Sequence, residues 1–304
     1  MKLGDKMAQK KKKKLKKNVK TMLIFLLCCF LITITILYSI NNKSSKTKPK
    51  STKTDTELKV KLKKLKNINE KISYFDNKKI DRYITYQNEN KDLDIKQIIL
   101  NVNMGLDNPY YTNTIPTKNL NTPTILVNKY NYLTEDYIPD NLESISTNYA
   151  REGMKLVNYA KDAFEELAQA AQKENMKIIA MSSYRSYTYQ VNLYNRYVAQ
   201  DGKEAADTYS ARAGFSEHQT GLAADVYNGK EDYTNFEKTK EFTWMQENAY
   251  KYGFILRFPK DKVKETGYQY ESWHYRYVGK EAAEYIHKHK ITLEEYYVKK
   301  IEKY

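Results

Sequence analysis

The sequence contains few cysteines and few histidines for its length. Among its 304 residues are two cysteines, Cys28 and Cys29, and four histidines. Both cysteines lie in one apolar run near the start of the chain, so disulfide bonds cannot stabilise a domain formed by the later residues. Hydrophobic residues make up 41% of the chain, which is enough to form a core. The folded part must depend on that core and on any metal that it binds.

Positive charge is concentrated at the start of the chain and is lacking in the rest. The net charge is +15, and residues 1–20 and 41–80 carry +9 each, whereas residues 21–40 carry none. Residues 81–304 therefore have a net charge of −3. A nucleic-acid-binding groove needs its basic residues within the folded domain, so this distribution argues against a nucleic-acid partner.

The uncharged residues 21–40 are predominantly apolar and have the length of about 20 residues that a helix needs to span a bilayer. Lysine-rich residues 1–20 precede this run, and the positive-inside rule places them in the cytoplasm. The run lacks the small-x-small cleavage site of a signal peptide, so we expect an uncleaved transmembrane anchor. The protein is thus expected in the cell membrane, with a single span and its C-terminal domain outside the cell.

A tether and a folded domain are expected after the anchor. Residues 41–80 are rich in Lys, Ser and Thr and begin with almost no large apolar residue, which predicts a flexible segment. The folded domain is expected over residues 81–304. Near its start, β-branched and aromatic residues predict strands at residues 82–87 and 95–103.

The clearest predicted element is a long helix. Apolar residues recur every three or four positions over residues 148–174, with Thr147 as the expected N-cap. Residues 177–183 predict a strand, and residues 188–200 predict a second helix that ends near Gly202. A long helix followed by a buried strand and short mixed elements is typical of an α+β fold, here with a small antiparallel sheet flanked by helices.

Two short segments, residues 211–226 and 270–279, contain side chains suited to bind a metal. Catalytic zinc takes three protein ligands, and His218, Asp225 and His274 would supply two imidazoles and one carboxylate without a thiol. Each histidine taken singly would more often be structural, but the three residues together indicate a zinc site. The two remaining histidines lie among lysines in a predicted C-terminal helix and are not assigned as ligands.

The span between the first two candidate ligands favours a loop that turns into a strand. Gly221 lies between His218 and Asp225 and permits a close approach of the backbone. The small and apolar residues 222–226 are typical of a buried strand that would carry Asp225 to the site.

Glu271 lies three residues before His274 and is the candidate general base. Hydrolysis by a metal-activated water needs a carboxylate that accepts a proton from the water and passes it to the leaving amine. The neighbouring Trp273 and Tyr275 predict a buried setting, in which an unpaired glutamate would be costly. The alternative is a surface glutamate that pairs with Arg276.

The segments SEHQTGLAAD, residues 216–225, and ESWHYRYVG, residues 271–279, resemble the paired signature of the VanY-like D-alanyl-D-alanine carboxypeptidases. This family of zinc metallopeptidases is related to lysostaphin-type enzymes and to hedgehog-type domains. The resemblance extends through three further segments: residues 126–133, 182–190 and 249–259. It leaves only the expected anchor and tether outside.

The resemblance implies that His218, Asp225 and His274 bind Zn²⁺ and that Glu271 is the general base. It also implies that Arg185 polarises the scissile carbonyl or stabilises the oxyanion, as a fixed guanidinium can do in a site that contains little water. The alternative for Arg185 is a structural salt bridge.

Two further residues concern the substrate pocket. Gln190 and Ser216 match positions that line the pocket in the family, although either side chain could instead cap a turn. The sequence departs from the family pattern by Ala213 and Ser272 where proline is common, and by Phe258 where tyrosine is common. The first two changes affect loop stiffness. The third removes a hydroxyl that could bind substrate, so it bears on the peptide specificity.

The expected activity is removal of the C-terminal D-alanine from peptidoglycan stem peptides. Two alternatives within the same enzyme class are an L,D-carboxypeptidase that acts on tetrapeptide stems and an endopeptidase that cuts cross-links. A third alternative is a non-catalytic zinc-containing module that binds the cell wall, against which the presence of Glu271 argues. The sequence does not predict the oligomeric state.

Overall fold

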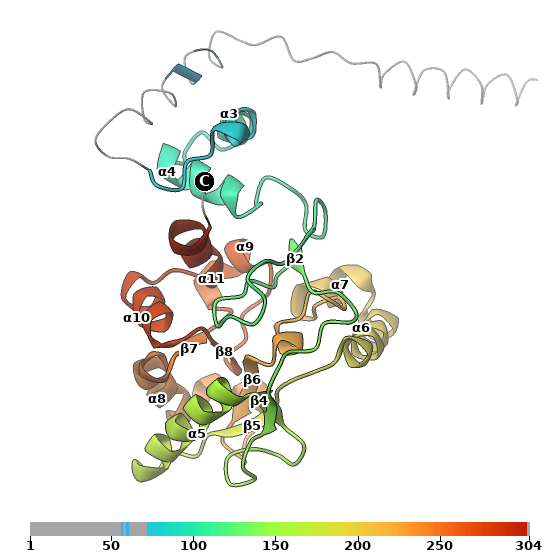
Figure 1. The fold of residues 1–304 in the computed structure, drawn as a ribbon, viewed down its shortest axis with the longest axis vertical. Helices are drawn as coiled ribbons and strands as arrows, with labels where there is room; N and C mark the ends of the chain where they lie inside the picture. The colour runs from blue at the N-terminus through green and yellow to red at the C-terminus, as the bar shows by residue number, and fades with distance from the viewer. Residues whose placement is uncertain (1–55, 57–58, 61–71, 303–304) are drawn as a thin grey trace, which may run out of the picture. The chain divides into compact units, whose positions relative to one another are not determined.

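A computed structural model describes residues 56, 59–60 and 72–302 of the chain (Figure 1). The expected cytoplasmic tail at 1–20, the expected anchor at 21–40 and most of the expected tether lie outside these described residues. Within the described residues, no helix is both long enough and apolar enough to cross a membrane.

Over residues 80–157 two α-helices precede four short strands, and from residue 158 onward helices and strands largely alternate. The α-helices are α3 (Ile80–Glu89), α4 (Ile95–Asn103), α5 (Asn158–Lys173), α6 (Tyr187–Asp201), α7 (Lys203–Tyr209), α8 (Lys240–Asn248), α9 (Val263–Thr266), α10 (Lys280–His289) and α11 (Leu293–Tyr296). The strands are β1 (Ile115–Pro116), β2 (Asn131–Tyr132), β3 (Leu142–Ser144), β4 (Lys155–Val157), β5 (Ile179–Ser182), β6 (Ala223–Tyr227), β7 (Phe254–Leu256) and β8 (His274–Tyr277). Short 3₁₀-helices are η1 (Asn77–Lys79), η2 (Glu217–Thr220), η3 (Tyr233–Lys238), η4 (Ala249–Tyr252) and η5 (Lys260–Lys262), and a π-helical turn, η6, spans Tyr297–Ile301.

A four-stranded sheet with the order β5-β6-β8-β7 forms the centre of the domain, and all its neighbouring strands are antiparallel. Two smaller two-stranded sheets, β1-β2 and β3-β4, lie outside it. Helices and a small antiparallel sheet confirm the predicted α+β class.

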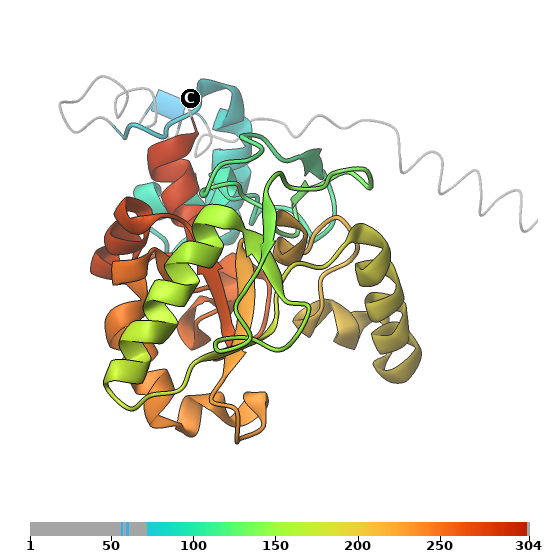
Figure 2. The same ribbon diagram turned by 60° about the horizontal axis from the view of Figure 1, so that its bottom comes forward.

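Helix α5 covers one face of this sheet, as the turned view shows (Figure 2). Its Phe164 lies 5.9 Å from the Phe254 ring of β7, and both belong to a cluster that also contains Ala224 and Val226 of β6. Side chains alternate between the two faces of a strand. Asp225, between Ala224 and Val226, therefore points to the face opposite α5.

The strands predicted at residues 82–87 and 95–103 are wrong, because both segments are helical. In α4 the buried residues Ile98, Ile99 and Val102 fall on one helical face, and the Asp94 side chain caps the first turn by accepting from the Gln97 backbone nitrogen at 2.9 Å. The helical spacing and this cap outweigh the strand preference of the β-branched residues.

The long helix begins at Asn158 rather than near residue 148, and Thr147 is not its N-cap. Residues 155–157 instead form β4, which pairs antiparallel with β3. Gly153, at φ +81°, lies in the turn just before this strand. The apolar spacing that suggested a longer helix thus includes residues of a β-hairpin.

The predicted strand at 177–183 and the predicted helix at 188–200 are confirmed as β5 and α6, and α6 ends before Gly202.

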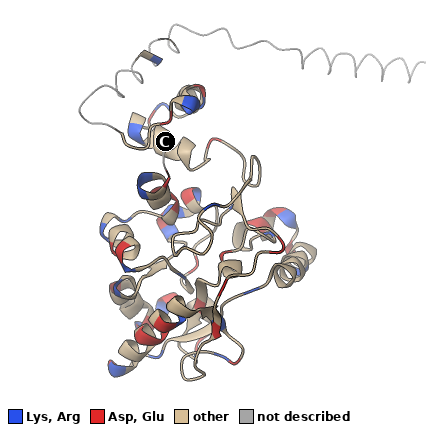
Figure 3. Ribbon diagram, in the orientation of Figure 1, with Lys and Arg blue, Asp and Glu red and all other residues tan. Residues whose placement is uncertain are grey.

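The folded residues begin earlier than the expected boundary at residue 81, since Ile72, Tyr74 and Phe75 pack against the α3–α4 cluster. Basic and acidic residues are interspersed over the described elements (Figure 3).

Candidate active site

Pairing of β6 with β8 brings two of the predicted ligands together. Asp225 and His274 are register partners in this antiparallel pair, and on the other side of β6 Asp225 pairs with Ser182 of β5. Residues directly opposite each other point to the same face of a sheet. His274 and Asp225 therefore share the face that α5 leaves uncovered.

The turn at Gly221 brings His218 to the same face. His218 lies in η2, which ends at Gly221 in the left-handed conformation, with φ +68°. A Cβ atom at Gly221 would lie 2.9 Å from Leu142 Cδ2 and 3.0 Å from Val157 Cγ2, so both the dihedral angle and the packing favour glycine. The predicted strand that carries Asp225 is confirmed as β6, but His218 lies in a 3₁₀-helix rather than in a loop.

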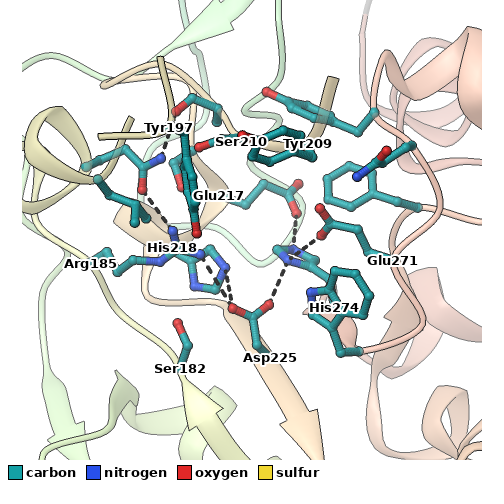
Figure 4. A pocket seen from close by; sticks show the side chains of 18 of the residues that line it. Ser182, Arg185, Tyr197, Tyr209, Ser210, Glu217, His218, Asp225, Glu271 and His274 are labelled. Atoms are coloured by element: carbon teal, nitrogen blue, oxygen red, sulfur yellow. Dashed lines mark hydrogen bonds and ion pairs between the residues drawn. The ribbon is translucent and has the colours of Figure 1, made fainter. Parts of the chain in front are cut away.

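His218, Asp225 and His274 form a buried group that could hold a metal ion (Figure 4). One ligand atom from each residue lies within 4.8 Å of the others. His218 Nε2 and Asp225 Oδ1 are buried and have no hydrogen-bond partner, although His274 Nδ1 is only 3.1 Å from Asp225 Oδ1. Two imidazoles and a carboxylate are the donors that zinc accepts, and orphaned buried polar atoms are costly without a ligand. The group therefore fits zinc.

Hydrogen bonds on the far side of each imidazole determine which nitrogen faces the group. His218 Nδ1 lies 2.6 Å from the Ser183 carbonyl oxygen, which can only accept, so Nδ1 carries the hydrogen and Nε2 presents its lone pair. His274 Nε2 lies 3.4 Å from Glu217 Oε2, which leaves Nδ1 facing Asp225. The two histidines thus present different ring nitrogens.

Burial and neighbouring charges shift the pKa values of the three residues. Burial lowers the pKa of His218 to about 4, with Arg185 adding to the effect. Burial also disfavours the charged forms of Asp225 and His274. The histidines nevertheless hold the pKa of Asp225 well below its usual range, and hydrogen bonds to Asp225 and Glu217 raise the pKa of His274 to about 9. Neutral His218 and ionised Asp225 are the forms that bind metals, whereas His274 must release a proton when it binds one.

Glu271 lies beside this group, with Oε2 at 3.6 Å from His274 Nδ1. Its burial, predicted from the aromatic neighbours, is confirmed, since 7% of the residue is exposed. Burial raises the pKa of Glu271 to about 8. A carboxyl with a pKa near neutrality is suited to accept and return a proton. The alternative pairing of Glu271 with Arg276 is wrong, because Arg276 Nη1 donates to Glu217 Oε1 at 2.7 Å.

Arg185 follows β5 and extends over the group from the side opposite Glu271 (Figure 4). Its Nη2 lies 3.5 Å from Asp225 Oδ2, and its Nη1 donates to Gln190 Oε1 at 3.0 Å. Arg185 Nε is buried without a partner. The Gln190 amide also donates to the Ala211 carbonyl at 2.7 Å, so both of its polar atoms are engaged within the protein. Gln190 therefore holds Arg185 in place.

The group opens into a cleft of about 520 Å³, a volume typical of ligand sites. Ser216, which is buried, lines this cleft, and its side chain makes no cap hydrogen bond to η2. Phe258, where a tyrosine was expected from the family, packs 4.8 Å from the His274 ring. Tyr268 lies 4.9 Å from Phe258 and also lines the cleft. The Tyr268 hydroxyl lies 3.3 Å from the Tyr111 hydroxyl.

Sequence reasoning missed three buried charged residues, Glu217, Arg257 and Glu294, and considered Arg276, also buried, only as a surface partner of Glu271. The available signal was the position of Glu217 directly before His218, because an acidic side chain beside a metal ligand can orient a ligand of the site. Burial raises the pKa of Glu217, but Arg257 and Arg276 outweigh this and hold it well below its usual range. The unassigned His287 stacks on Tyr250 with a ring separation of 3.8 Å, outside the candidate group.

Comparison with known proteins identifies the family of this chain. The family VanY: D-alanyl-D-alanine carboxypeptidase matches residues 153–280. A putative carboxypeptidase of Bacillus subtilis, YodJ, is 39% identical over 233 residues, which cover 71% of this chain and 85% of the relative. The chain belongs to the VanY family. A D-alanyl-D-alanine carboxypeptidase of Enterococcus faecalis is 36% identical over 57% of this chain and 64% of the relative.

Solved structures of this family and of its relatives have the same fold. The LdcB LD-carboxypeptidase has a TM-score of 0.55 at 41% identity, covering 58% of this chain and 87% of the neighbour. VanYB in complex with D-alanine-D-alanine has a TM-score of 0.51 at 35% identity, over 57% and 96% of the two chains. A VanY D,D-pentapeptidase in complex with Zn(II) has a TM-score of 0.51 at 34% identity, over 57% and 98%.

Proposed function

We propose that this VanY-family protein is a zinc-dependent D-alanyl-D-alanine carboxypeptidase that removes the C-terminal D-alanine of peptidoglycan stem peptides. The observation that carries the proposal is the buried group of His218, Asp225 and His274, which lines a cleft of about 520 Å³. Glu271 Oε2 lies 3.6 Å from His274 Nδ1 of this group. Solved relatives named for Zn(II) and for D-alanine-D-alanine support the choice of metal and substrate.

His218 Nε2, one oxygen of Asp225 and His274 Nδ1 would hold the metal. Zinc in such a site supplies Lewis acidity toward the scissile carbonyl and toward water. Glu271 then accepts a proton from the attacking water at its carboxylate and returns it to the departing amine of D-alanine. Its buried position excludes bulk water, which would otherwise compete for that proton.

Arg185 is proposed to donate to the scissile carbonyl oxygen as negative charge develops there. Its guanidinium is fixed by Gln190 on one side and Asp225 on the other, and its Nε lacks a partner within the protein. A preorganised donor of this kind contributes about 10²–10³ in rate. Ser216 is proposed to contact the peptide from the cleft wall.

A second candidate function is an L,D-carboxypeptidase that acts on tetrapeptide stems. One observation favours it: the likeness to the LdcB LD-carboxypeptidase, at 41% identity over 58% of this chain.

Defined stem peptides distinguish these functions. The purified, zinc-loaded full-length protein is incubated with pentapeptide stems, tetrapeptide stems and cross-linked dimers, and the products are identified by mass spectrometry. Loss of one alanine from the pentapeptide alone is the expected result. Loss from the tetrapeptide would instead identify the L,D-activity, and cleavage of the dimers would identify an endopeptidase. Absence of any product would favour a non-catalytic wall-binding module.

We also propose that the catalytic domain acts outside the cell, anchored by the uncharged residues 21–40. The support is the apolar run itself and the ten lysines within residues 1–20 that precede it. Protease added to cells whose wall has been removed should digest the domain; a domain fully protected until the membrane is lysed would contradict this placement.

A further inference from the structure

A buried network of charges begins behind the candidate metal group and leads away from the cleft. Glu217 Oε1 accepts from Arg257 Nε at 2.8 Å and from Arg276 Nη1 at 2.7 Å. Arg257 then donates two hydrogen bonds to Glu294, at 3.0 and 2.6 Å. None of these four residues is more than 4% exposed.

The end of the network nearest the cleft contacts the imidazole of a candidate ligand. The second oxygen of Glu217, Oε2, lies 3.4 Å from His274 Nε2 (Figure 4). An ionised carboxylate only accepts hydrogen bonds, so this contact favours the tautomer in which His274 carries its hydrogen on Nε2. The lone pair of Nδ1 is then directed toward Asp225 and the metal position. A second hydrogen-bond partner of this kind typically fixes the ring orientation of a metal ligand.

Charge balance explains why the network needs all four members. A single buried carboxylate such as Glu217 would be very unfavourable, and one arginine would neutralise it. Two arginines contact Glu217, so Glu294 is needed to compensate the second positive charge. Arg276 is further fixed by the carbonyl oxygens of Pro123 and Ile125. The geometry of Arg257, which joins the two glutamates, is bidentate toward Glu294 and therefore rigid.

The far end of the network lies outside residues 153–280, which match the family. Glu294 belongs to α11, and its Oε1 also accepts from Asn128 Nδ2 at 3.2 Å. α11 is itself fixed by a capping box between Thr292 and Glu295. Asn128, which precedes the region that matches the family, and α11, which follows it, therefore meet at Glu294.

We propose that Glu217 and Glu294 are positioning residues for the metal site, and that α11 orients His274 through Glu294, Arg257 and Glu217. The inference rests on the proposed metal site but not on the identity of the peptide substrate. The proposal assigns to α11 a role in metal affinity rather than in substrate contact.

Metal affinity and the tautomer of His274 test this proposal. The zinc Kd of the full-length protein is measured by competition with a chromophoric chelator for wild type, Glu217→Gln and Glu294→Gln. We expect Glu217→Gln to weaken binding by about 10–100-fold, because the amide can donate to His274 Nε2 and so admit the wrong tautomer. Glu294→Gln should weaken it by a smaller factor. ¹⁵N NMR of His274 in the zinc-loaded protein should show hydrogen on Nε2 in wild type.

A matched control separates positioning from a loss of stability. Asp107→Asn breaks the bidentate pair with Arg82, at 2.6 and 2.7 Å; neither residue lines the cleft, and no hydrogen bond among the described residues joins either of them to the network. It should lower the Tm without changing the zinc Kd. Arg257→Lys keeps the positive charge but loses the bidentate geometry. It is the test variant of the network if Glu217→Gln does not fold.

The proposal is overturned if the folded variants among Glu217→Gln, Glu294→Gln and Arg257→Lys bind zinc as tightly as wild type while losing Tm as Asp107→Asn does. It is also overturned if His274 carries its hydrogen on Nδ1 in the wild-type protein. A wild type that binds zinc but cleaves no stem peptide would refute the proposed function and leave this positioning role intact.

Discussion

His218 and His274 present different ring nitrogens to Asp225, and a hydrogen bond behind each ring accounts for the difference. The Ser183 carbonyl holds His218 Nδ1, and Glu217 holds His274 Nε2. The identity of the ligands could be predicted from the residue types and their clustering in two segments. The choice of nitrogen could not, because it depends on a carbonyl and a carboxylate that only the folded chain brings into contact with the rings.

The buried amino group of Lys129 leads to a prediction for the pH dependence of stability. Lys129 is 3% exposed, and its ammonium group lies 4.3 Å from the ring centre of Tyr268 and 4.9 Å from that of Tyr110. The ammonium group also donates to the Asp207 carbonyl. Burial lowers its pKa from 10.5 to about 8, despite the opposing effect of the Asp207 charge.

Between pH 8 and about 10.5 the folded protein has lost the Lys129 proton while the unfolded chain still holds it. The free energy of unfolding contributed by this residue should therefore rise with pH across this window. Below pH 8 both states are charged and the contribution is constant. Urea unfolding of wild type and Lys129→Met over pH 7–10 measures the effect as a rise in the free energy of unfolding of wild type relative to that of the variant; parallel curves for the two proteins would refute it.

Among the elements, the short turn at Gly221 determines the distance between His218 and the strand that carries Asp225. Alanine at Gly221 would need a positive φ and would place Cβ 2.9 Å from Leu142 Cδ2. Gly153 is a matched control, because it also has a positive φ, +81°, but nothing lies within 4 Å of an added Cβ.

We expect Gly153→Ala to lower the free energy of unfolding by about 1–2 kcal/mol, the cost of a left-handed residue with a side chain. Gly221→Ala should lower it by more and should also weaken zinc binding, because relief of the clash displaces η2 and with it His218. Chemical denaturation and a zinc titration of both variants provide the measurement. Equal losses of stability with unchanged zinc affinity would show that packing at Gly221 does not matter.

Element types were predicted well where one physical signal dominated. Buried β5 and the long α6 have unambiguous patterns, whereas α3 and α4 combine β-branched residues with helical spacing. In α4 the spacing of Ile95, Ile98, Ile99 and Val102 was a helical signal, and it outweighed residue preference because it buries one face against α3. The β3–β4 hairpin was not predicted, because each of its strands has only three residues, too few to show the alternation that indicates a strand.

For the molecule as a whole, the two cysteines at positions 28 and 29 leave the described residues without any disulfide. A metal that binds only the folded state stabilises it in proportion to the logarithm of its concentration, by about 4 kcal/mol at a thousand times Kd. We therefore expect a chelator to lower the Tm of the zinc-loaded protein, and a reductant to leave it unchanged.

Calorimetry of the wild-type protein and of Asp225→Ala checks this expectation. Asp225→Ala removes one of the three ligands, so its Tm should not respond to the chelator. If the wild-type Tm also stays constant, the buried group does not hold a metal that stabilises the fold.

The central claim is that one buried site combines metal binding with proton transfer, and that the two functions belong to different residues. Zinc content and the rate of D-alanine release from a pentapeptide stem, measured on the same preparations of wild type and Glu271→Gln, test it most directly. The account predicts equal zinc content and a rate that falls by about 10²–10⁴ in the variant. Undiminished release of D-alanine by zinc-loaded Glu271→Gln would contradict it.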